Sequence, residues 1–114
     1  MALVYKICPA ALWREAERNG TFRGMGIDLK DGFIHLSTAQ QAVETARLHF
    51  AGQTDLVLVA VDGAALGNAL KWEPSRGGAL FPHLDGALPV TAVTRVDPLP
   101  LDANGRHVFP EMAP

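Results

Sequence analysis

The segment DLVLVAVD, residues 55–62, constrains the fold more than any other part of this chain. The six residues between its two aspartates are all apolar. A strand that carries apolar side chains on both sides is typical of the interior of a sheet that is covered on both faces. We therefore predict a central strand here. At 114 residues the chain has the size of one domain, so we expect its other segments to surround this strand.

Four other segments have the composition or the alternation of strands. They are residues 3–8, 32–37, 69–74 and 91–99. Alternation in the third of these places Trp72 and Glu73 on opposite sides of the strand. Helices and strands are interspersed early and strands dominate late, which favours one α+β domain over residues 1–114, with a mixed or antiparallel sheet. Pro, Gly and Asn in residues 101–114 predict a loosely structured tail.

Two main helices are predicted from their end signals. The first follows Pro9 and ends at Gly20. For the second, we predict Ser37 as the N-cap, with Gln40 completing a capping box and Gly52 ending the helix. The apolar stripe expected on this second helix consists of Ala39, Val43, Ala46 and Phe50.

Charge and hydropathy narrow the class of protein. The net charge is −2 and the basic residues are scattered, so we do not expect nucleic acid as a partner. The sequence has no run of 18 apolar residues, so it predicts no membrane-spanning helix. We therefore expect a soluble, cytoplasmic protein with no membrane partner. The single cysteine, Cys8, ends an apolar run and is predicted to be a buried, unreactive thiol.

The stretch EPSRGGALFPHLDG, residues 73–86, concentrates polar groups between two apolar segments, and we predict a long loop there. Its candidate functional residues are Glu73, Arg76, Gly77, Gly78, His83 and Asp85. An arginine can hold a phosphate or carboxylate through two parallel hydrogen bonds, and a glycine pair lets the backbone approach a ligand closely. The alternative is an ion pair between Glu73 and Arg76 that pins an exposed turn.

His35 and Ser37 share one side of the strand 32–37, directly before the second helix. Anionic ligands often bind at this position, because free N–H groups and the helix dipole point there. The alternatives are that Ser37 is only an N-cap and that His35 is a hydrogen-bonded core residue. No HxxxH, HExxH or paired CxxC spacing supports a metal site formed by His35, His83 and Asp85, and we predict no metal.

Four segments together resemble a known family. VYKICPAALW, DGFIHLSTAQQ, LKWEPSRGGALFPHLDG and AVTRV are similar, in order and spacing, to the bacterial domain of unknown function family 952. The resemblance covers about residues 3–100. It implies a remote similarity to the ADP-ribosyltransferase-like fold, a strongly curved mixed sheet whose cleft holds NAD.

The resemblance also implies a shared site. Family members share the residues His35, Glu73, Arg76, Gly77, Gly78 and His83. Position 85, commonly tyrosine in the family, is Asp85 here, and Lys6 stands where some members of the superfamily have a histidine that contacts NAD.

Two classes of function are open at this point. In the first, a small ADP-ribosyltransferase-like enzyme binds NAD or another phosphorylated ligand. His35 orients a ribose or phosphate of this ligand, and Arg76 neutralises the charge of its phosphate. Glu73 or His83 is the acid or base. In the second, the same residues form a noncatalytic ligand-binding or regulatory module, or a structural polar network. Ser37 and Trp72 are further ligand-binding candidates. A Glu73–His35 or Glu73–His83 hydrogen bond favours chemistry.

Overall fold

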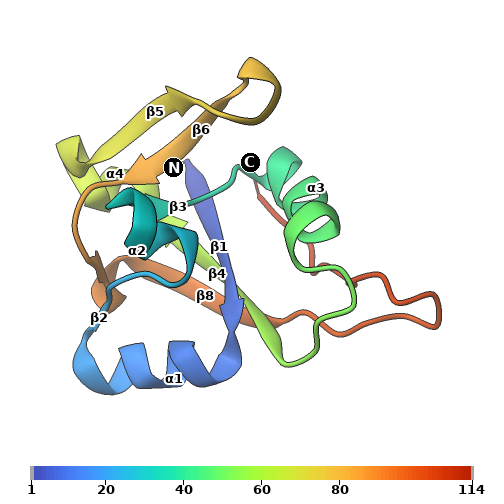
Figure 1. Ribbon diagram of the computed structural model, residues 1–114. Coiled ribbons are helices and arrows are strands. Elements are labelled where there is room, and N and C mark those ends of the chain that lie inside the picture. Colours follow the sequence, from blue (N-terminus) through green and yellow to red (C-terminus); the bar gives the residue numbers. More distant parts are fainter. Residues whose placement is uncertain (1, 114) are drawn as a thin grey trace.

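A computed structural model describes residues 2–113, apart from the Arg76 side chain. It shows helices combined with antiparallel sheets, which confirms the α+β class (Figure 1). The helices are α1 (Ala10–Asn19), α2 (Ile27–Asp31), α3 (Ala39–His49) and α4 (Gly63–Leu66). The strands are β1 (Leu3–Pro9), β2 (Thr21–Phe22), β3 (Ile34–His35), β4 (Leu56–Asp62), β5 (Leu70–Pro74), β6 (Leu80–Leu84), β7 (Leu88–Pro89) and β8 (Val93–Pro98).

Strand β4 lies at the centre of the first sheet, as its apolar sequence predicts. It pairs antiparallel with β1 on one side and with β8 on the other. Val59 and Val61 of β4 have no exposed surface. Helix α1 packs against this sheet through Trp13 and Ala16, while α3 contacts it at β1. The central strand is therefore covered on both faces.

A second sheet carries His35, Glu73 and His83, three of the polar residues that the sequence highlights. Its strand order is β3-β6-β5, and all pairs are antiparallel. One bridge joins it to the first sheet: the Tyr5 N–H donates to the Ser37 carbonyl at 2.7 Å, and the Ser37 N–H donates to the Tyr5 carbonyl at 2.9 Å. Figure 1 shows the β5–β6 hairpin extending from this junction, with α2 beside β3. A third, short pair is formed by β2 and β7.

Helix α3, the second of the two helices predicted from the sequence, differs from the prediction at both ends. Its N-cap is Thr38 rather than Ser37, and Gln41 completes the capping box. Ser37 is one residue too early because its backbone is still engaged with Tyr5. The helix ends at His49, before the predicted Gly52.

The buried face of α3 is also shifted by one position. Val43 is 51 % exposed, whereas the buried residues of the helix are Ala42 and Ala46. The expected stripe was therefore wrong at Val43.

Residues 73–86 do not form one long loop, and this prediction was wrong. Strand β6 occupies Leu80–Leu84 and pairs along the whole of β5, so only a short turn separates the two strands. Pro82 argues against a central strand in the sequence, because it offers no N–H to a neighbour. Here the Pro82 carbonyl still accepts a hydrogen bond from the Leu36 N–H at 2.9 Å.

Cys8 is completely buried, as predicted. Burial raises the pKa of its thiol to about 12, with Lys6 opposing the shift. The tail after β8 has no helix or strand among residues 99–113 but is not detached. Its Phe109 and Met112 pack against a core cluster that includes Tyr5 and Leu58, and the Tyr5 hydroxyl donates to the Ala113 carbonyl at 2.8 Å.

Candidate functional site

The site is built around two histidines that face each other across neighbouring strands. His35 of β3 is directly opposite His83 of β6, and their ring centroids are 5.3 Å apart. The Phe33 ring packs on both, at 4.6 Å from His35 and 4.4 Å from His83. These three rings form a single cluster, which we call the imidazole cluster.

His83 is hydrogen-bonded to a carboxylate. Its Nδ1 atom lies 2.8 Å from Oε1 of Glu73. The β5–β6 register explains the contact: Lys71 is directly opposite His83, and Glu73, two residues further, points to the same face. His83 is 6 % exposed, whereas the Glu73 side chain is 49 % exposed. The carboxylate therefore lies at the edge of the site, with the imidazole inside.

This contact fixes how His83 can carry its protons. A carboxylate is only an acceptor, so Nδ1 is the protonated nitrogen and Nε2 of the neutral ring keeps its lone pair. No group among the described residues forms a hydrogen bond with Nε2. His83 thus has one oriented nitrogen and one nitrogen available to accept a proton.

Asp28 of α2 holds the other side of the cluster. It is 3 % exposed. Its Oδ1 accepts from the His35 N–H at 3.0 Å and lies 2.7 Å from His35 Nδ1. Its Oδ2 accepts from Lys6 Nζ at 2.8 Å and from the Met25 N–H at 3.0 Å. Burial alone would raise the pKa of Asp28, but the Lys6 ammonium and the hydrogen bonds from Lys6 and His35 hold it below its ordinary value.

His35 has a carboxylate oxygen at each ring nitrogen. Asp28 is at Nδ1, and Oδ2 of Asp31 lies 3.1 Å from Nε2. Both contacts are hydrogen bonds at once only when the ring carries two protons. Lys6 Nζ also donates to the His35 carbonyl at 3.1 Å. His35 is therefore held in place through both its ring and its backbone.

Gly24 makes room for Asp28. Its φ is +106°, and a Cβ built at this position would lie 2.8 Å from the Asp28 Cβ. Helix α2 then places Asp28 and Asp31 one turn apart, and Gly32 ends the helix in the left-handed conformation with a φ of 81°. The turn-rich segment before β3 is therefore what brings both carboxylates to His35.

Of the residues predicted from the sequence, the structure brings together His35, His83 and Glu73. Ser37 is buried, with its hydroxyl 3.1 Å from that of Thr45. Trp72 is half-exposed on the face of β5 opposite to Glu73, as the alternation predicts.

The remaining predicted residues lie at the two ends of the β5–β6 hairpin. Gly77 and Gly78 form the turn beyond the last β5–β6 pair, both with positive φ. The Arg76 backbone lies in the same turn, but its side chain is outside the described residues. Asp85 is exposed and forms an ion pair with Lys71 at 2.8 Å.

Four contributors were missed as members of the site. They are Lys6, Asp28, Asp31 and Phe33. Lys6 carried a usable signal, because a lysine inside an apolar strand needs a buried anionic partner. The two aspartates carried none, because Asp and Gly together also describe an ordinary turn.

Two kinds of feature are absent from the described residues. No group of three or more His, Cys, Asp or Glu side chains there is arranged to hold a metal ion. Within the same residues, no helix is long and apolar enough to cross a membrane.

Residues 7–96 match the model of a protein family described as protein of unknown function (DUF952). The chain belongs to the DUF952 family. It is 54% identical to protein CC0527 from Caulobacter crescentus, whose crystal structure superposes with a TM-score of 0.89 over 93% of each chain. The solution NMR structure of CC0527 gives 55% identity and a TM-score of 0.83, over 93% of this chain and 91% of that one. No curated protein matches.

The DUF952 match includes strands β3, β5 and β6 and helix α2, which carry His35, Glu73, His83 and the two aspartates, whereas Lys6 lies just before it. It confirms the family that the sequence motifs indicate. The remote relationship to ADP-ribosyltransferases, which the resemblance also implied, stays a prediction.

Proposed function

We propose that the imidazole cluster is an acid–base site for a small anionic ligand, and that Nε2 of His83 exchanges a proton with it. The observation that carries this proposal is the 2.8 Å contact between His83 Nδ1 and Glu73. A histidine oriented by a carboxylate at one nitrogen and open at the other is the usual arrangement of a general base.

Glu73 has a supporting role in this scheme. When Nε2 takes a proton, the ring becomes an imidazolium, and the adjacent carboxylate stabilises that charge. Its side chain is half-exposed, which lets a ligand approach the pair from solvent. Glu73 therefore orients His83 and lowers the free energy of its charged form.

His35 places a second, firmly held imidazole ring next to this pair. Asp28 and Asp31 hold its ring through both nitrogens, and Lys6 holds its backbone carbonyl. A preorganised hydrogen-bonding group stabilises negative charge that is present on a ligand or develops during a reaction. Asp28 and Lys6 are positioning residues in this scheme, because they act through His35.

The family resemblance suggests which ligands to test first. If the remote relationship to ADP-ribosyltransferases holds, the ligand is NAD or another phosphorylated molecule. In that version His35 contacts phosphate or ribose, and Glu73 is the carboxylate nearest to an oxocarbenium-like ribose.

A noncatalytic module is the second candidate, and one observation favours it. The Lys6–Asp28–His35 contacts connect β1, α2 and β3, as a structural network would. Such a network fixes the shape of a binding face without any need for proton transfer.

The test is a titration of ¹⁵N-labelled protein with NAD, ADP-ribose and inorganic phosphate, followed by proton NMR of the ligand for turnover. The proposal expects shifts on residues 33–35 and 71–84 with at least one ligand. His35→Gln should weaken binding, His83→Gln should keep binding but abolish turnover, and the exposed His49→Gln is the control. Binding without turnover in the wild type assigns the site to the noncatalytic module, and absence of shifts with every ligand overturns both.

A further inference from the structure

A depression of about 250 Å³ lies beside the imidazole cluster. Its lining residues include Arg23, Asp28, Gly32, Phe33, Gly86 and Ala87. Nothing lies within 4 Å of a Cβ built at Gly32 or Gly86, so these glycines leave open space. The volume is below the roughly 300 Å³ at which sites for drug-sized ligands begin, so it suits one compact chemical group.

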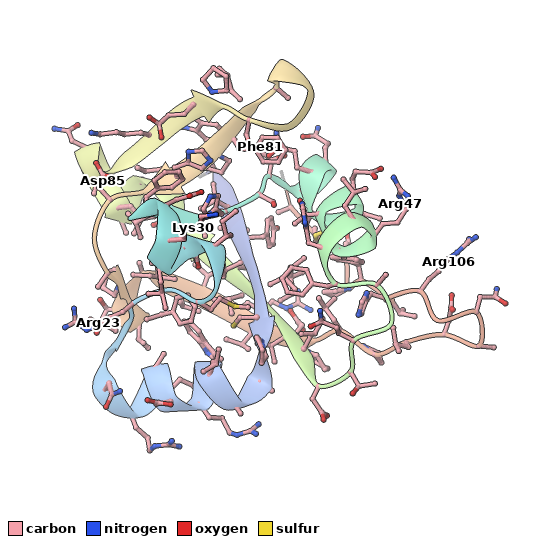
Figure 2. All side chains as sticks on the ribbon, in the orientation of Figure 1. Arg23, Lys30, Arg47, Phe81, Asp85 and Arg106 are labelled. Carbon is pink, nitrogen blue, oxygen red and sulfur yellow. The ribbon has the colours of Figure 1, made fainter. Side chains whose placement is uncertain are left out.

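The acidic side chains around this depression form ion pairs, whereas its arginine forms none within the described part of the chain. Asp28 is paired with Lys6, Asp31 with His35, and Asp85, next to Gly86, with Lys71. Arg23, in contrast, is exposed and has no carboxylate within ion-pair distance among the described residues. Figure 2 shows its side chain reaching outward from the segment that follows β2. The one uncompensated charge at the depression is therefore positive.

Phe33 connects the depression to the imidazole cluster. Its ring packs against both histidines and also lines the depression. A ligand with its reacting end at His83 and a second group beyond Phe33 would reach this space.

We propose that the depression binds a phosphate-sized anionic group, held by the Arg23 guanidinium. A guanidinium matches the geometry of phosphate oxygens through two parallel hydrogen bonds. The use of this subsite rests on the proposed function: the substrate is a phosphorylated small molecule with its phosphate at Arg23 and its reacting atom at His83. A whole dinucleotide exceeds this depression, so only one anionic group occupies it.

Inorganic phosphate is the probe for the test, with ¹⁵N-labelled full-length protein. We expect saturable shifts at residues 23, 32–33 and 86–87. Arg23→Gln should weaken phosphate binding by about tenfold or more, because charge-assisted hydrogen bonds are lost. Arg18→Gln, an exposed arginine at the end of α1, is the matched control and should bind as the wild type does. Ala87→Leu should also weaken binding, because it fills the depression without changing charge.

Phosphate binding that is absent, or unchanged in Arg23→Gln, overturns the inference. His83→Gln separates it from the proposed function, because the anion subsite does not include His83. This variant should bind phosphate normally even if the acid–base role fails. Phosphate shifts that disappear in His83→Gln but persist in Arg23→Gln place the anion on the histidines and contradict a subsite at Arg23.

Discussion

Oε1 of Glu73 lies 2.8 Å from Nδ1 of His83, across two adjacent antiparallel strands. On the other side of the imidazole cluster, Asp28 forms the same kind of contact with Nδ1 of His35. The two histidines differ at Nε2: that of His35 faces Asp31, while that of His83 has no partner among the described residues. In the proposed function, this difference makes His35 a positioned, fully bonded ring and His83 the proton acceptor.

Asp28→Asn should destabilise the protein by about 3 kcal/mol or more, because it leaves the buried Lys6 ammonium without its counter-charge. Urea unfolding measures this loss. Asp31→Asn is the control and should cost less than about 1 kcal/mol, since its side chain is more than a third exposed. Adding Lys6→Met to Asp28→Asn should recover part of the loss. Equal effects of Asp28→Asn and Asp31→Asn would show that the Lys6 contact contributes nothing.

Protonation of the Asp28 carboxylate should cause part of the loss of stability in acid. Its pKa is lowered in the folded state, so the unfolded chain takes up the proton first as the pH falls. The stabilisation by ionised Asp28 is complete above the pKa of an aspartate in the unfolded chain, about 3.9. It is lost as the pH falls through the lower pKa of Asp28 in the folded protein. Urea midpoints between pH 5 and about pH 2.5 should therefore fall less steeply in Asp28→Asn. An unchanged slope in this variant would contradict the assignment.

Gly24→Ala should destabilise the folded protein more than an alanine substitution at another glycine with positive φ. Gly105, with a φ of +77° and open space around it, is the matched control. Both variants incur the left-handed penalty of about 1–2 kcal/mol, but only Gly24→Ala also forces a contact with the Asp28 Cβ. Thermal unfolding measures the difference, and NMR should show altered His35 resonances only in Gly24→Ala. The same loss in both variants would mean that Asp28 adjusts freely.

Cys8 should resist thiol reagents in the native protein, because it is buried and its pKa is raised to about 12. Labelling with a maleimide, followed by mass spectrometry, should be slow in buffer and complete in urea. Fast labelling under native conditions would show that β1 opens locally.

Much of the fold was accessible from the sequence because its signals were local. The six apolar residues of β4 predict a central strand without any knowledge of its partners. Strand β6 was not accessible in this way, since Pro82 and the flanking glycines carry the signature of a loop and only pairing with two neighbours overrides it. The prediction of Ser37 as the cap fails for the same reason: its pairing with Tyr5 is a long-range contact.

The candidate site also contains residues that local signals identify and residues that only tertiary contacts identify. His35, His83 and Glu73 could be selected by residue type and by alternation along strands. Asp28 and Asp31 could not, because their role depends on how α2 folds back onto β3. Residue type indicates possible chemistry, but tertiary contacts decide which groups meet.

The most direct measurement is of the imidazole tautomers, from ¹⁵N chemical shifts of the ring nitrogens at about pH 8, where an ordinary histidine is neutral. A His83→Gln sample assigns the signals. We expect His83 to carry its proton on Nδ1, with Nε2 unprotonated, and Glu73→Gln to weaken this preference. A proton on Nε2 of His83 in the wild type would rule out the proposed acid–base role, because the nitrogen proposed to accept a proton would already hold one.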